Sequence, residues 1–150
     1  MKKIFLTTFF IIQLILDCSD ENYGKDLLNV SWELFSLKNA PQPIQYSSEN
    51  DNYLLKFKST KNKYYEGVAH GSDGCNSFSS PYKIFDENTI EFQGLTMTKM
   101  ACRPYPALAD DFLEILKNSI NYIVNNLQLK LFYNSNQFEL VFKGSPPVEN

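Results

Sequence analysis

Apolar and polar residues alternate along most of this chain, and this period of two constrains its fold more than any other feature. Val30, Trp32 and Leu34 lie between polar Ser31 and Glu33, as in a strand that buries one face. Similar short runs, bounded by turn residues, predict further strands at 53–58, 64–69, 81–85, 89–93, 95–101, 127–131 and 138–142. The domain is therefore expected to be mostly β.

One segment has the period of a helix instead. After Pro104 and Pro106, apolar residues recur at steps of three and four, at positions 108, 112, 115, 116 and 120. This spacing predicts one helix over 106–119. Together with about seven to eight short strands, it predicts an α+β, mostly β fold, in which one helix packs on a small curled antiparallel sheet or barrel.

Gly67, Gly71 and Gly74 interrupt the strand pattern. Glycine weakens a strand because it costs backbone entropy and has no side chain to pack. No regular strand is therefore expected to continue past residue 69, and residues 71–80 are expected to form an exposed loop.

The N-terminal residues have the pattern of an export signal. Lys2 and Lys3 precede an apolar stretch at 4–16, which is shorter than the roughly 20 residues of a membrane span. Cys18 follows and resembles the lipidated cysteine of bacterial lipoproteins. Asp17 stands where a small residue is usual, a departure that the relaxed pattern of Bacteroidetes-type lipoproteins allows. Ordinary signal cleavage nearby is the alternative.

These features divide the chain into four parts. The predicted parts are a lipoprotein-type signal peptide at 1–17, a tether at 18–29, one domain at 30–143 and a loose tail at 144–150. The expected location is the cell envelope, with Cys18 anchoring the domain to the outer membrane on its periplasmic or surface face.

The chain has three cysteines. If Cys18 carries lipid, Cys75 and Cys102 remain as a pair in an oxidising compartment, where a structural disulfide is expected. The alternative is a redox-active or metal-binding thiol pair. It is disfavoured because the chain has no C-x-x-C spacing and His70 is its only histidine. No metal site and no cofactor are expected.

Two separated motifs carry a family resemblance. Residues 74–79 read Gly-Cys-Asn-Ser-Phe-Ser, and residues 98–102 read Thr-Lys-Met-Ala-Cys. With an early tryptophan, they resemble the META domain family of HslJ-like proteins. The resemblance implies a small exported or membrane-anchored domain, linked to stress and antibiotic tolerance and without an established catalytic activity. The motif residues are Trp32, Gly74, Cys75, Asn76, Phe78, Ser79, Thr98, Met100 and Cys102.

Structural roles explain the motif without a ligand. Asn76 is expected to bridge a tight turn, Phe78 to plug one end of a barrel, and Met100 to fill a gap in the core. The alternative is that the loop 71–80 contacts a ligand.

Charge disfavours nucleic-acid binding. The full chain has a net charge of -3, and loss of residues 1–17 leaves 12 basic and 16 acidic side chains, a net charge of -4. Phosphate contacts need clustered cations. The only basic run is Lys56, Lys58, Lys61 and Lys63. Lys56 and Lys58 are expected to be solvated on an outward strand face, and Lys61 and Lys63 in the turn that follows. Contact with a lipid headgroup or a glycan is the alternative.

Catalysis is also disfavoured. His70, Ser72 and Asp73 are the residue types of a hydrolase triad, but side chains this close along an extended segment diverge. The acidic residues Asp110, Asp111 and Glu114 of the predicted helix are expected to form a solvated face. The chain is therefore not expected to be an enzyme, and no catalytic residue is assigned.

Two functions remain. The first is a lipid-anchored envelope domain that contacts a protein partner or supports stress tolerance. The second is a pilot-like carrier that binds an apolar ligand or acyl chain. A filled core favours the first function, and an apolar cavity beneath the helix favours the second.

Overall fold

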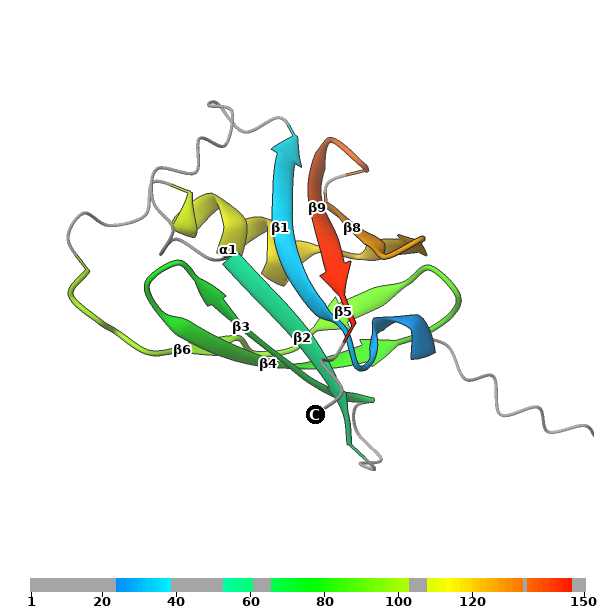
Figure 1. The fold of residues 1–150 in the computed structure, drawn as a ribbon, viewed down its shortest axis with the longest axis horizontal. Coiled ribbons are helices and arrows are strands. Elements are labelled where there is room, and N and C mark those ends of the chain that lie inside the picture. The colour runs from blue at the N-terminus through cyan, green and yellow to red at the C-terminus, as the bar shows by residue number, and fades with distance from the viewer. Residues whose placement is uncertain (1–23, 39–52, 61–65, 103–107, 134, 147–150) are drawn as a thin grey trace, which may run out of the picture.

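A computed structural model of the chain describes residues 24–38, 53–60, 66–102, 108–133 and 135–146. Within them, nine antiparallel strands form one curled sheet with one α-helix packed on it, which confirms the predicted fold class (Figure 1). The elements are η1 (Lys25–Leu27), β1 (Ser31–Lys38), β2 (Tyr53–Ser59), β3 (Gly67–Asp73), β4 (Ser77–Ile84), β5 (Ile90–Phe92), β6 (Thr96–Met97), α1 (Ala109–Asn118), β7 (Asn121–Asn125), β8 (Gln128–Tyr133) and β9 (Phe138–Ser145). The predicted signal peptide at 1–17 and Cys18 lie outside the described residues.

The sheet curls until its two edges meet. Its strand order is β5-β4-β3-β2-β1-β9-β8-β7, and β6 pairs with the first part of β4. Across the seam, the Ile90 N–H donates to the Ile120 carbonyl at 3.1 Å, and the Tyr122 N–H donates to the Asn88 carbonyl at 2.8 Å. These hydrogen bonds nearly close the sheet into a barrel.

The inward residues of β1 follow the predicted alternation at first. Trp32 and Leu34 are buried in the core. A β-bulge after Leu34 then shifts the register, so that Leu37 is the next buried residue. Phe35 stays half exposed, with the ammonium of Lys143 3.6 Å from its ring centroid. A bulge adds one residue to one strand, which period-two alternation does not anticipate.

The helix plugs one opening of the barrel. α1 lies within the predicted range 106–119, whose first two residues are outside the described part. The Phe112 ring is fully buried, and its centroid lies 5.3 Å from that of Tyr53, 5.9 Å from that of Phe78 and 6.3 Å from that of Phe142. These rings belong to β2, β4 and β9, so one helical side chain connects strands that are far apart in the sequence.

The expected loop at 71–80 is instead a hairpin, in which β3 and β4 continue to a short turn. A Cβ on Gly71 would collide with a backbone carbonyl of β2 and with the Phe78 ring. A Cβ on Gly67 would collide with another β2 carbonyl and crowd the Tyr82 ring. Aromatic rings of β4 thus pack over the glycines of β3 and supply the contacts that glycine lacks. The loop prediction was wrong because this packing comes from the neighbouring strand.

β7 is a strand that alternation did not reveal. Its middle residues Tyr122, Ile123 and Val124 are all apolar or aromatic, so they have no period of two. β7 joins β8 through a turn in which Asn126 and Leu127 have φ of 46° and 56°. Leucine is unusual in this left-handed region. The alternation at 127–131 therefore predicts that Leu127 begins a strand, whereas in the structure it lies in the turn.

The fold extends beyond both predicted ends of the domain. Leu27, within the predicted tether 18–29, is fully buried, and its carbonyl accepts a hydrogen bond from the Trp32 indole N–H at 3.1 Å. Burying an indole requires such an acceptor. At the other end, Gly144 and Ser145 pair with β1, so β9 occupies the start of the predicted tail.

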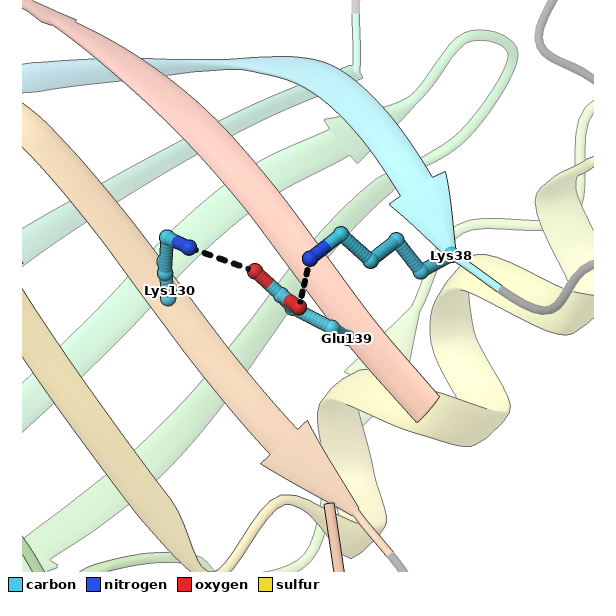
Figure 2. Close-up of polar contacts among 3 residues, drawn as sticks. All are labelled: Lys38, Lys130 and Glu139. Atoms are coloured by element: carbon cyan, nitrogen blue, oxygen red, sulfur yellow. Dashed lines mark hydrogen bonds and ion pairs between the residues drawn. The ribbon is translucent and has the colours of Figure 1, made fainter. Parts of the chain in front are cut away.

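A buried carboxylate on the outer face of β9 connects three strands. Glu139 is 7% exposed. One of its oxygens lies 2.6 Å from the Lys38 Nζ on β1, and the other lies 2.9 Å from the Lys130 Nζ on β8 (Figure 2). Burial by itself raises the pKa of Glu139, but the two ammonium groups outweigh it and leave the pKa below its ordinary value.

We expect Glu139→Gln to lower the free energy of unfolding by about 1 kcal/mol at neutral pH, because both ammonium groups lose their anionic partner. The folded pKa of Glu139 lies below the unfolded value of 4.5. Its stabilisation is therefore complete above pH 4.5 and is lost as the pH falls through the folded pKa. Urea unfolding of both proteins should show a difference that narrows in acid. A difference independent of pH would contradict this, and Glu33→Gln, which removes an exposed carboxylate, is the control.

Candidate functional site

The turn between β3 and β4 is built around one buried carboxylate. The Asp73 Oδ1 accepts hydrogen bonds from the N–H groups of Cys75 at 2.9 Å and Asn76 at 2.5 Å. Gly74, with φ of 88°, adopts the left-handed conformation that the turn requires. The strand pattern does not reveal this role of Asp73, although an Asp-Gly pair is a turn signal.

Asn76 connects this turn to a distant segment. Its side-chain Oδ1 accepts hydrogen bonds from the Met100 N–H at 2.7 Å and from the Thr98 hydroxyl at 3.3 Å. The Thr98 Oγ1 accepts in turn from the Ser77 N–H at 3.1 Å, and the Thr98 N–H donates to the Ser77 carbonyl at 3.0 Å. Asn76 is 4% exposed, so water competes little for these bonds. We call Asn76 and Thr98, with their hydrogen bonds, the clamp.

A disulfide joins the same two segments. Cys75 and Cys102 are bonded, with Cα atoms 6.0 Å apart and a sequence separation of 27. This is the pairing that cysteine parity predicted. Closing such a loop lowers the entropy of the unfolded chain and so stabilises the fold by about 3 kcal/mol. Among the described residues, no three His, Cys, Asp or Glu side chains are grouped so that they could hold a metal ion.

The clamp leaves two methionines on the surface. Met97 is 38% exposed and Met100 is 61% exposed. The expectation that Met100 fills a core gap is therefore wrong, because the clamp binds its backbone and leaves its side chain outside. Phe78 is buried against Phe112, in keeping with its predicted role as a plug.

An open cleft of about 540 Å³ lies between this segment and α1. Both apolar and charged side chains line it. The apolar ones are Phe92, Leu95, Met97 and Leu113, and the charged ones are Asp110, Glu114 and Lys117. Asp110 and Glu114 are exposed, as expected of a solvated helix face, whereas Asp111 is partly buried.

The residue types of a hydrolase triad do not converge. His70 and Ser72 lie on the outward face of β3, whereas Asp73 is fully buried on the inward side. His70 pairs with Lys56 of β2. Partial burial, and then the charge of Lys58, lower the pKa of His70. His70 is therefore mostly neutral near pH 7 and faces away from the buried carboxylate.

The hairpin, clamp and disulfide define a class of protein: a small, nearly closed β-barrel that is plugged by one helix and stapled to its β6 segment. The family profile described as the META domain matches residues 25–145. The chain belongs to the META domain family, as its two motifs indicated. No curated protein matches the chain.

Two solved structures have the same fold. The NMR structure of a protein from Burkholderia xenovorans is 26% identical, with a TM-score of 0.62, and the match covers 79% of this chain and 83% of that one. The crystal structure of a DUF4847 family protein from Bacteroides vulgatus is 16% identical, with a TM-score of 0.55. That match covers 81% of this chain and 96% of the other, and it concerns the fold alone.

We expect Cys75→Ala and Cys102→Ala each to lower the free energy of unfolding by about 3 kcal/mol in the same non-reducing buffer, because each removes the same loop constraint. The double variant should be no less stable than the weaker single variant, since a shared loss indicates one bond. Urea unfolding measures all three proteins. Cys18→Ala is the matched control and should leave the stability of the domain unchanged. Additive losses at Cys75 and Cys102 would contradict a structural disulfide.

Proposed function

We propose that this META domain is a lipid-anchored, non-catalytic component of the bacterial cell envelope, where it supports stress tolerance by contacting another protein. The observation that supports this proposal is what the residues of the family motif do in the structure. Asn76, Thr98 and the disulfide hold one exposed segment against the barrel. What they create is a rigid surface, with Met97 and Met100 at its edge.

Such a surface suits protein binding. A methionine side chain is flexible and polarisable, so it adapts to the shape of a partner. A rigid backbone lowers the entropy that association costs. The cleft beside α1 continues the apolar surface with the partly exposed Leu95. A partner segment with apolar side chains would bury Leu95 together with the two methionines.

Core packing favours this function over a carrier of apolar ligands. A carrier needs an apolar cavity beneath the helix. Under α1, that space holds the rings of Phe112, Tyr53, Phe78 and Phe142, each 4% exposed or less. The interior is therefore filled by the side chains of the domain.

One sequence feature and one structural feature support the envelope location. The export pattern at 1–17 is followed by Cys18, six residues before the described fold begins at Gly24. The disulfide suits an oxidising compartment outside the cytosol. Among the described residues, no helix is long and apolar enough to span a bilayer.

Cys18→Ala should move the domain from the membrane fraction to the soluble fraction, because the acylated thiol is its anchor. Fractionation of cells followed by immunoblotting measures this, and mass spectrometry of the wild-type protein should detect the lipid. Ser31→Ala, a change on the folded domain, is the control that stays with the membrane. A Cys18→Ala protein that remains membrane-bound through an uncleaved signal would refute lipid anchoring.

A second experiment tests the binding surface. Met97→Ser combined with Met100→Ser should abolish stress tolerance in cells, because it removes apolar contact area and keeps the clamp. Phe85→Ser is the matched control, since Phe85 is 57% exposed on another turn, and it should keep tolerance.

His70→Ala should also keep tolerance within about twofold, because loss of an acid–base group typically costs 100-fold or more. Circular dichroism and immunoblotting must show all variants folded and equally abundant. Loss of tolerance in His70→Ala, with tolerance kept in the methionine variant, would overturn the proposal.

A further inference from the structure

One edge of the sheet stays open beside the proposed binding surface. In the part of the chain that the structure describes, β6 pairs with β4 on one side and has no strand on its other side. Residues 96–100, which include β6, are all exposed. An unpaired strand edge presents backbone N–H and carbonyl groups with which another strand can pair.

The register shows which backbone groups of β6 face this open edge. Met97 lies opposite Phe78 of β4. One residue further on, the Thr98 N–H donates to the Ser77 carbonyl at 3.0 Å. Hydrogen-bonded and non-hydrogen-bonded pairs alternate along an antiparallel ladder. The pair of Met97 and Phe78 is therefore non-hydrogen-bonded, and the N–H and carbonyl of Met97 point away from β4, towards the open edge.

Contacts within the chain hold this edge extended. The Thr96 hydroxyl donates to the Ser79 carbonyl at 3.2 Å. Further along the segment, the clamp binds Thr98 and the Met100 N–H, and the disulfide attaches Cys102 to the β3–β4 turn. A strand edge that is already ordered loses less entropy when a partner binds it.

The cleft of about 540 Å³ beside α1 lies along this edge. Met97 of β6 and Leu113 of α1 are among its lining residues, and none of the lining residues belongs to β4. The cleft is therefore on the side of β6 that faces away from β4, and Figure 1 shows α1 above β6. An open strand edge and a helix thus form two walls of one cleft, whose volume is typical of a ligand site.

The lining of the cleft determines which side chains an added strand needs. Residues opposite each other in a sheet share a face, so Met97 is on the same face as the buried Phe78. Every second residue of an added strand would face the cleft with Met97. The α1 wall adds the carboxylates of Asp110 and Glu114 and one cation, Lys117. The cleft-facing positions therefore favour apolar side chains together with a lysine or an arginine.

We propose that the protein partner adds an extended strand to the open edge of β6, forms hydrogen bonds with the Met97 backbone and places apolar and basic side chains in the cleft. This inference rests on the proposed function, because it specifies how the partner contacts the surface beside Met97 and Met100. In strand addition, backbone hydrogen bonds supply affinity and pockets for alternate side chains supply specificity. The clamp and the disulfide then keep the receiving backbone extended.

The first test is an NMR titration of the isotope-labelled full chain in a non-ionic detergent. The probe is the peptide Thr-Leu-Thr-Lys-Thr-Leu-Thr, whose leucine and lysine side chains all lie on one face when it is extended. One control peptide has methylated backbone nitrogens, which cannot donate hydrogen bonds, and the other has glutamate in place of lysine. We expect the probe to slow hydrogen exchange of the Met97 amide. Both control peptides should bind about tenfold more weakly, the effect of losing backbone or charge-assisted hydrogen bonds.

Met97→Pro tests the backbone of β6 directly. Proline has no N–H, and it is tolerated in an edge strand where the N–H faces away from the sheet. This variant should therefore fold with the clamp intact, which circular dichroism checks. Met97→Ala is the matched control, because it also removes the methionine side chain but keeps the N–H. Met97→Pro should bind the probe about tenfold more weakly than Met97→Ala does.

Four results would overturn the proposal: binding of the methylated peptide as tight as that of the probe, equally tight binding of the glutamate peptide, no binding of any peptide, or equal affinity of the two Met97 variants. Protection of the Met97 amide that appears without peptide, as the protein concentration rises, would also overturn it and assign the edge to a second copy of the chain.

Stress tolerance in cells separates this inference from the proposed function. Met97→Pro should reduce tolerance more than Met97→Ala does, because only the proline variant loses the edge N–H. Equal tolerance in these two variants, with tolerance lost when Met97→Ser is combined with Met100→Ser, would reject strand addition and leave the envelope function untouched.

Discussion

The fold depends on the packing of the Phe112 ring inside the barrel. A sheet that curls this tightly must fill its interior, and the strands of this domain leave one opening uncovered until α1 packs there. Phe112 brings one large ring to the point where Tyr53, Phe78 and Phe142 meet. Truncating such a side chain would lose apolar burial and would also open a cavity that three strands line.

Other features of the domain follow from filling that interior. Phe78 can reach Phe112 only because it passes over Gly71, where a Cβ would collide with the ring. The glycine in turn brings β3 and β4 together as far as their turn, where Asp73 and Asn76 organise the backbone. Packing inside the barrel thus positions the polar clamp outside it.

Some residues of the family motif stabilise the fold through the clamp, and other side chains beside them are left at the surface. The polar groups of the clamp are used for hydrogen bonds within the chain, so they are not available to a substrate. The groups left at the surface are the methionine side chains and the cleft beside α1, which both apolar and charged side chains line.

The sequence by itself determined the parts of the structure that local pattern encodes. Alternation at Trp32 and Leu34, helical spacing around Phe112, and the pairing of Cys75 with Cys102 all follow from residue type and order. Contacts between distant residues decided the rest. The strand through Gly71 depends on a ring from the next strand, and burial of Leu27 depends on the Trp32 indole. Tyr122 meets Asn88 only when the barrel closes, because the hydrogen bond from the Tyr122 N–H to the Asn88 carbonyl joins two sheet edges that are far apart in the sequence.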